Sequence, residues 1–336
     1  MYRSANWLQI VTAAAVVAAA GCGGTSATSN AAALPSTAAG GAQLAAHLHA
    51  IGGTLHAARR GGGWLSPAAK SGKHLVYVSD FLKNAVEIYD ASGSNQSPIG
   101  EITDGISGPE GCSVDRKGDL FVTNATNFTV TMYPRGSTSY TLLYTGFAYP
   151  TNVAVGADGM VYVVDLVGKK VVEFPRGKTR SKRTISISYP QGAALDAANN
   201  LYVSHNTGAN GAGPGDVEEY APGSTTGTSL HLPVVWSAGD AVDRQGDVVV
   251  ADQGSGIGNA AVYVFPPGST TPSLTITQGI EDPFRIALDK RFRHLYVADP
   301  EVAAVLVYQY PSGKYANTIS TGLSSAYGVA VFPAGN

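Results

Sequence analysis

The stretch Asn152-Val-Ala-Val-Gly156, with Val161-Tyr-Val-Val-Asp165 and Phe174-Pro-Arg-Gly177 after it, is one copy of a unit that recurs six times between Lys73 and Phe332. Each copy contains a first strand that ends near an acid, a second aromatic–valine strand, and a third strand that runs into a turn. The turns carry the glycines Gly93, Gly136, Gly177, Gly223, Gly268 and Gly313. These glycines lie 41 to 46 residues apart, and such a period, dense in short strands, is typical of β-propellers.

The ends of the repeat array predict how the ring closes. Residues 73–90 supply only the second and third strands of a blade, and a matching first strand appears at the other end of the chain, as Tyr327-Gly-Val-Ala-Val-Phe332. A weaker fourth strand follows each turn, as at Leu274-Thr-Ile-Thr277. We therefore predict an all-β domain over residues 73–333. It is a six-bladed β-propeller with four strands per blade, in which the C-terminal strand completes the first blade and leaves no open edge.

The N-terminal residues are typical of an export signal. An apolar stretch from Leu8 to Ala20 follows Arg3 and is too short to span a membrane permanently. It ends in Ala19-Ala-Gly-Cys22, which is similar to a bacterial lipobox. We predict a lipoprotein signal peptide over residues 1–21 and a lipid on Cys22, which places the protein in the periplasm or on the cell surface. Cleavage after Ala20, which would release a secreted protein, is the alternative.

The rest of the N-terminal region, residues 22–72, is predicted to be a low-complexity linker with a short helix within residues 42–60. The whole chain has a net charge of −2, which argues against a nucleic-acid partner. If the lipid occupies Cys22, only Cys112 remains and no intramolecular disulfide can form. We expect a monomer whose only membrane contact is the lipid, and Cys112 as a small buried apolar residue.

The repeats resemble those of the NHL group of six-bladed propellers, as in Arg285-Ile-Ala-Leu-Asp289 followed by Leu295-Tyr-Val-Ala-Asp299. The resemblance covers roughly residues 73–333 and implies a fold rather than a function. The related gluconolactonase-like enzymes hold a divalent cation at the channel mouth with one Glu and several Asn or Asp residues. That relationship implies a Ca²⁺ site for which Glu110 and Gln191 are the matching positions, although Ala, Phe and Tyr stand at three others.

Binding residues are expected at the channel mouth, where the first strands begin and the second strands end. The predicted set is Glu110, Asn124, Asn152, Gln191, Asp240 and Tyr327. Two glycine-rich loops, residues 206–216 and 253–260, lengthen the fourth and fifth blades on this side. They are interpreted either as recognition loops or as tolerated insertions.

Two registers of repeated acids have a structural explanation. Second strands end on Asp80, Asp165, Asp252 and Asp299, and we expect these acids to accept hydrogen bonds from backbone N–H groups of nearby turns. The first-strand acids Asp115, Asp196, Asp243 and Asp289 are expected to hold the hairpin turns at the opposite end. His205 replaces the acid in the fourth blade. It is a candidate general base or ligand, and a repeat position that drifted is the alternative.

These observations favour a binding or scaffold module that takes a protein or small ligand at the channel mouth. The sequence shows no nucleophile–base pair, which favours a non-enzymatic role and leaves the question of catalysis open. The alternative is a divergent metal-dependent hydrolase of the lactonase type, or a lyase, acting at the central channel.

Overall fold

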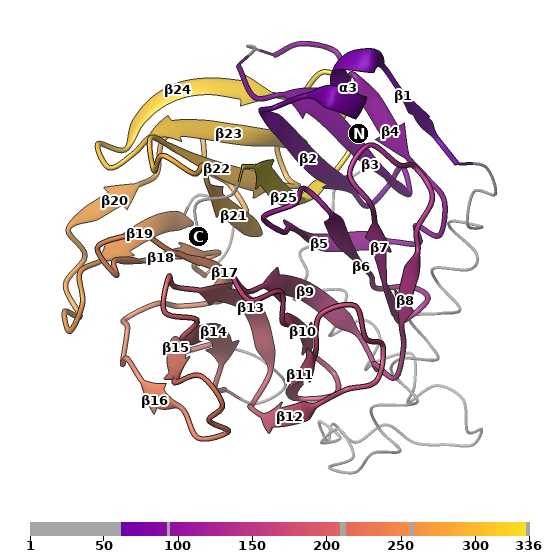
Figure 1. The fold of residues 1–336 in the computed structure, drawn as a ribbon. Helices are drawn as coiled ribbons and strands as arrows, with labels where there is room; N and C mark the ends of the chain where they lie inside the picture. Colours follow the sequence, from indigo (N-terminus) through magenta and orange to yellow (C-terminus); the bar gives the residue numbers. More distant parts are fainter. Residues whose placement is uncertain (1–61, 93–94, 209–212, 256–258, 334–336) are drawn as a thin grey trace, which may run out of the picture.

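The computed structural model describes residues 62–92, 95–208, 213–255 and 259–333, and its ribbon shows six antiparallel sheets arranged around a central axis (Figure 1). The inner strands are β25 (Ala326–Phe332), β5 (Pro109–Val114), β9 (Pro150–Val155), β13 (Pro190–Leu195), β17 (Ser237–Val242) and β21 (Arg285–Leu288). The second strands are β2 (Leu75–Asp80), β6 (Leu120–Asn124), β10 (Val161–Asp165), β14 (Leu201–Asn206), β18 (Val248–Asp252) and β22 (His294–Asp299). The third strands are β3 (Ala85–Asp90), β7 (Thr129–Tyr133), β11 (Lys170–Phe174), β15 (Gly215–Tyr220), β19 (Ala261–Phe265) and β23 (Ala304–Gln309). The outer strands are β4 (Gly100–Ile102), β8 (Leu142–Tyr144), β12 (Arg183–Ser186), β16 (Thr228–Ser229), β20 (Leu274–Ile276) and β24 (Lys314–Ile319).

The first blade is closed by the end of the chain, as predicted. Strand β25 pairs antiparallel with β2, with Ala330 opposite Tyr77 and Val329 opposite Val78. The strand order of this sheet is β1-β4-β3-β2-β25. The all-β, six-bladed prediction with four strands per blade is therefore confirmed.

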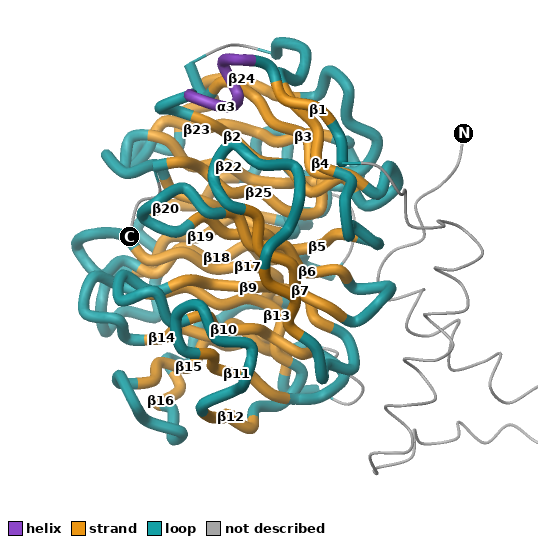
Figure 2. The backbone as a smooth tube through the Cα atoms, turned by 45° about the vertical axis from the view of Figure 1, so that its right-hand side comes forward, coloured by secondary structure: helices purple, strands orange, loops and turns teal. Residues whose placement is uncertain are grey.

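The first blade also has a fifth, outermost strand that begins before the expected start of the domain at Lys73. Strand β1 (Trp64–Leu65) pairs with β4, and helix α3 (Pro67–Ser71) follows it with Ser66 as its N-cap. Figure 2 shows this helix at the edge of the β-structure. The predicted signal peptide, Cys22 and the helix expected within residues 42–60 all lie outside the described residues. Within the described ranges, no helix is long and apolar enough to cross a membrane.

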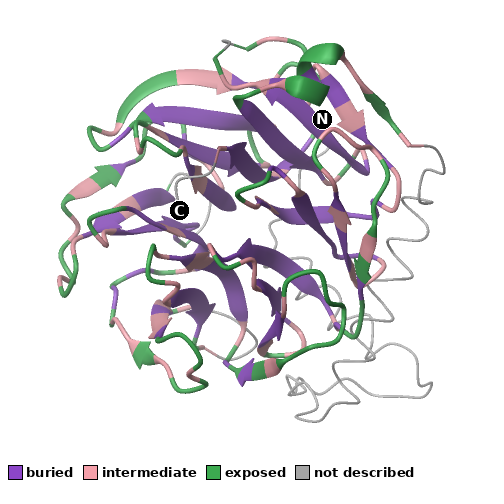
Figure 3. Ribbon diagram, viewed as in Figure 1, coloured by how far each residue is buried: buried purple, intermediate pink, exposed green. Residues whose placement is uncertain are grey.

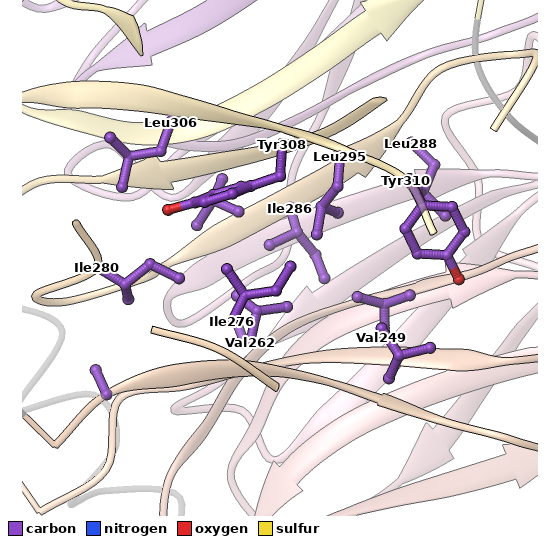
Figure 4. Packing of buried hydrophobic residues seen from close by; sticks show 14 of the residues in the cluster. Val249, Val262, Ile276, Ile280, Ile286, Leu288, Leu295, Leu306, Tyr308 and Tyr310 are labelled. Atoms are coloured by element: carbon purple, nitrogen blue, oxygen red, sulfur yellow. The ribbon is translucent and has the colours of Figure 1, made fainter. Parts of the chain in front are cut away.

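The hydrophobic core is divided among the spaces between neighbouring blades. Between the fifth and sixth blades, Val249, Val262 and Ile276 face Leu295 and Tyr308, and all five are nearly fully buried (Figure 4). The second strands are the most deeply buried parts of nearly every sheet, and the outer strands carry most of the exposed strand residues (Figure 3). A fully buried aliphatic side chain stabilises a fold by about 1.5–3 kcal/mol, so packing between blades holds the ring together.

The repeated acids bind backbone N–H groups at both ends of the blades, as predicted. At the end of β22, Asp299 accepts hydrogen bonds from the N–H groups of Glu281, Asp282, Glu301 and Val302 at 2.8–3.4 Å. Corresponding bonds reach Asp80, Asp165 and Asp252. At the opposite end, Asp115, Asp196, Asp243 and Asp289 each accept two N–H groups of their own hairpin turn.

Candidate functional site: the central channel

The axis of the propeller is crossed by Arg285, the first residue of β21 in the sixth blade. Its guanidinium donates to the backbone oxygens of Thr151, Ala238 and Phe284, each at 3.0 Å. Thr151 belongs to the third blade, on the opposite side of the ring, so this one side chain joins strands that are not neighbours. The sequence analysis placed Arg285 only in a strand motif and did not predict this role.

Glycines allow the inner strands to approach one another closely at this level of the channel. At the register position of Arg285, four of the other five inner strands carry Gly111, Gly192, Gly239 and Gly328. A Cβ atom on Gly239 would lie 2.8 Å from the Phe284 oxygen, and one on Gly328 would lie 2.1 Å from the Glu110 oxygen. The inner strands therefore approach too closely for any larger residue at these two positions.

Glu110, on β5 of the second blade, is fully buried beside this arginine. Its Oε2 lies 3.8 Å from the Arg285 Nη2, and its Oε1 accepts a hydrogen bond of 2.7 Å from the Tyr149 hydroxyl. Burial raises the pKa of Glu110 to about 7, although Arg285 and Tyr149 both oppose the rise. Glu110 is therefore the carboxyl half of a buried ion pair.

Asp240, on β17 of the fifth blade, is the second buried acid near Arg285. Its Oδ1 lies 3.4 Å from the Ser204 hydroxyl, while Oδ2 has no hydrogen-bonding partner among the described residues. Burial raises the pKa of Asp240 to about 7 against the opposing effects of Arg285 and Ser204, and it lowers the pKa of Arg285 to about 10. The channel thus holds two carboxyl groups and one guanidinium.

The predicted mouth of the channel is covered by aromatic rings. The Tyr327 ring centroid lies 4.9 Å from that of Phe81 and 4.8 Å from that of Phe284, and the Arg285 guanidinium lies 4.4 Å from the Phe284 ring. Gln191 is only 3 % exposed at this end. Glu110, Gln191 and Tyr327 are therefore part of a closed end of the channel.

The open space lies at the other end, where the inner strands finish. A cavity of about 110 Å³ extends along the axis from Asn152, Asp240 and Arg285 toward the hairpin turns. Small residues line it on all six inner strands: Ser113, Ala154, Ala194, Ala241, Ala287 and Ala330. Each is paired with a residue of the neighbouring second strand, as Ala154 is with Tyr162 and Ala194 with Tyr202.

The structure separates the six predicted binding residues. Asn152 and Asp240 line the cavity, whereas Glu110, Gln191 and Tyr327 belong to the closed end. Asn124 is away from both, because its side chain accepts from the Ser107 N–H at 3.1 Å and donates to the Thr131 hydroxyl at 3.0 Å. The structure therefore places these six residues in three different surroundings.

His205 ends the second strand of its blade, where other blades have an aspartate. It contacts the backbone segment before the inner strand, which is the segment that those aspartates bind. Its Nδ1 lies 3.2 Å from the oxygen of Ser188, which precedes the inner strand of its own blade, and its Nε2 lies 3.7 Å from a Glu218 oxygen. In the third blade, Asp165 reaches the N–H of Tyr149 at the matching place. The geometry of His205 favours a repeat position that drifted over a general base in the channel.

The residues around Glu110 do not fit the implied Ca²⁺ site. A guanidinium already lies 3.8 Å from its free carboxylate oxygen, where it would repel a divalent cation. Within the part of the chain that the structure describes, no three His, Cys, Asp or Glu side chains are grouped as metal ligands. We therefore derive no chemistry through a metal.

Comparisons with known proteins agree on the fold. No family model matches the chain, and no curated protein matches it in sequence. Among solved structures, a chain from the crystal structure of a nidogen/laminin complex aligns with a TM-score of 0.62 at 14 % identity, over 77 % of this chain and 98 % of that one. A chain of hydrazine synthase from Kuenenia stuttgartiensis aligns with a TM-score of 0.59 at 16 % identity, over 81 % and 89 %. At such identities the likeness concerns the propeller fold alone, which is consistent with a binding or scaffold module.

Proposed function

We propose that this chain is a non-catalytic, NHL-type binding propeller that takes a small ligand in its central channel. The observation that carries the proposal is the cavity at the hairpin end, in which six small side chains surround open space above buried polar groups. Pockets with mostly apolar walls and a few convergent polar groups are typical ligand sites. The ligand enters at the end of the channel opposite the predicted mouth.

The arrangement of charges supports binding rather than catalysis. Arg285 has three of its N–H groups engaged by backbone oxygens, and Glu110 is held by Tyr149. Such groups hold the strands of the ring together and are not free to attack a substrate. We expect purified protein to show no turnover of lactones or esters.

The cavity can be tested with alanine methyl groups as reporters. Protein labelled with ¹³C at alanine methyls is titrated with a panel of small molecules, and the resonances of Ala194, Ala241 and Ala287 are followed by NMR. We expect at least one class of compound to shift these resonances, and Ala241→Leu, which fills the cavity, to abolish the shift. Ala197→Leu, at an exposed hairpin position, is the matched control. If no compound reaches the channel alanines, the proposal fails.

The place of the protein in the cell is proposed separately. We infer that the chain is exported and tethered by a lipid on Cys22, because Ala19-Ala-Gly-Cys22 follows an apolar segment. Metabolic labelling with a tagged fatty acid should label the full chain and not Cys22→Ser. Labelling of both variants, or of neither, would contradict the tether and leave the secreted alternative.

A further inference from the structure

A second pocket lies between the fourth and fifth blades, on the side of the hairpin turns and away from the axis. It has a volume of about 230 Å³. The fourth blade contributes Tyr202, Glu219 and Leu230 to its walls, and the fifth blade contributes Phe265 and the turn at Gly268. Tyr202 and Phe265 are nearly fully buried, whereas Glu219 is half-buried. The pocket therefore has largely apolar walls and one carboxylate that a ligand can reach.

The third blade has the same pair of residues, but there an arginine fills the space beside them. Tyr162 is paired with Glu173, and Glu173 is paired with Arg183 of the outer strand β12. The Arg183 Nε donates to Glu173 Oε1 at 3.0 Å, and its Nη2 contacts the same oxygen. A Cβ atom on Gly223, in a turn of the fourth blade, would lie 3.6 Å from the Arg183 Nη1. The Arg183 guanidinium therefore occupies the space between the third and fourth blades.

The fourth blade keeps the tyrosine and the glutamate but has no arginine beside them. Tyr202 is paired with Glu219, and its hydroxyl donates to Glu219 Oε1 at 3.1 Å. Glu219 is in turn paired with Thr228 of β16, an outer strand of two residues where β12 has four (Figure 1). No cation among the described residues forms an ion pair with Glu219. Because directly paired residues of antiparallel strands share a face, the short Thr228 side chain leaves open the place that Arg183 fills in the third blade.

We propose that this pocket binds an alkylguanidinium group, which donates to the Glu219 carboxylate as Arg183 donates to Glu173. A planar guanidinium suits the site because it offers several N–H donors to one carboxylate. Its alkyl chain packs against Leu230 and the ring of Phe265. The group belongs either to free arginine or to an arginine side chain of a peptide. The site is separate from the central channel, so the inference goes beyond the proposed function and does not depend on it.

The test uses N-acetyl-arginine methylamide as the probe on protein labelled with ¹³C at leucine methyls. The resonances of Leu230 and Leu232, which line the pocket, are followed by NMR. N-acetyl-citrulline methylamide has nearly the same shape without the charge, and we expect it to bind about tenfold more weakly than the arginine compound. Equal binding of the two compounds, or no shift with any form of arginine, would overturn the proposal.

Free arginine, titrated in parallel, distinguishes the two sources of the group. Tighter binding of free arginine than of the blocked compound would identify the amino acid as the ligand. Equal or weaker binding would identify an arginine side chain within a peptide, because the α-amino and α-carboxyl groups then contribute nothing.

Variants of β15 locate the effect at Glu219. Glu219→Gln, which keeps the size of the side chain, should weaken binding of the arginine probe by about tenfold. Glu218→Gln is the matched control and should bind as the parent does. Glu218 is the next residue along the strand, so it lies on the opposite face, where it accepts a hydrogen bond from the Tyr220 hydroxyl. Unchanged affinity in Glu219→Gln would overturn the proposal.

A variant of β16 tests the comparison between the blades directly. Thr228→Arg introduces a guanidinium at the exposed register position that Arg183 has in the third blade. The new side chain should pair with Glu219 and weaken binding of the probe by about tenfold, while the thermal unfolding transition is retained. Unchanged affinity in this variant would overturn the equivalence of the two blades on which the proposal rests.

Discussion

The acids that end the second strands and the acids in the channel are all buried, yet they have different partners. Asp299 and Glu110 are both 0 % exposed. Burial raises the pKa of Asp299, and four backbone N–H groups oppose that rise. Glu110 and Asp240 have no backbone donors of this kind from a neighbouring turn and depend on one shared arginine. The second-strand acids therefore obtain their hydrogen-bond donors from backbone N–H groups of nearby loops. The channel acids depend instead on an arginine from another blade.

The largest effect is expected when Arg285, the cation that both channel acids share, is removed. Arg285→Met should lower the free energy of unfolding by about 3–5 kcal/mol, because it leaves two buried carboxyl groups without their compensating charge. Urea unfolding followed by circular dichroism measures the loss. Arg244→Met, at an exposed arginine that contacts Phe292, is the control and should cost about 1 kcal/mol or less. A similar small cost for both variants would show that Arg285 does not hold the channel together.

The channel acids should also make stability depend on pH. Their folded pKa values of about 7 lie above the ordinary values of 4.5 for Glu110 and 3.8 for Asp240. Between these limits the folded state holds more protons than the unfolded state, so stability falls as pH rises from about 4.5 to 7. The loss is on the order of a few kcal/mol.

Unfolding measured across this range checks that slope. The double variant Glu110→Gln with Asp240→Asn should flatten it, since neither replacement titrates. A slope that persists in the double variant would place its origin in other groups.

A smaller effect is expected at a single blade-end acid. Asp299→Ala removes the acceptor of four N–H bonds, two in the loop before β21 and two in the turn after β22, and should lower the free energy of unfolding by about 1–3 kcal/mol. Thermal unfolding measures this. Unlike the Arg285 variant, its stability deficit should stay nearly constant between pH 6 and 8. A deficit that changes strongly in that window would remove the distinction between the two groups of acids.

The smallest effect is expected at a hairpin acid. Asp196→Ala removes the hydrogen bonds from the backbone N–H groups of Ala198 and Asn200 and from the Asn200 side-chain amide. They lie at a half-exposed turn, where water replaces the lost partner. We expect about 1 kcal/mol of destabilisation. A loss as large as that of Arg285→Met would mean that the hairpin turns, rather than the channel, limit the stability of the ring.

The local parts of the structure could be predicted from residues close together in sequence. The carboxylates of Asp115 and Asp289 each accept hydrogen bonds from the backbone N–H groups two and four residues later. A short sequence motif therefore contains both the acceptor and its donors. The closing of the ring was also predictable, because the missing first strand of one blade appears as Tyr327–Phe332. His205 was harder, since the repeat register marks it as an exception without saying which backbone group it meets.

The site depended on contacts that no motif contains. Arg285 and Thr151 are separated by 134 residues, and Glu110 and Tyr149 by 39. Repeat register placed Glu110 and Gln191 at one end of the channel, but it could not show that Phe81, Phe284 and Tyr327 cover that end. It also could not show that Ser113 and five alanines leave the other end open, because each contributes only one small side chain from its own blade.

The sequence by itself determined the number of blades, their strand order and the turn-binding acids, because each follows from a short pattern repeated at a regular period. Only the tertiary structure decided which end of the channel is open and which charges meet on the axis. The physical reason is that six inner strands, far apart along the chain, converge there. Their close approach at the glycines and the reach of Arg285 to Thr151 depend on the assembled ring.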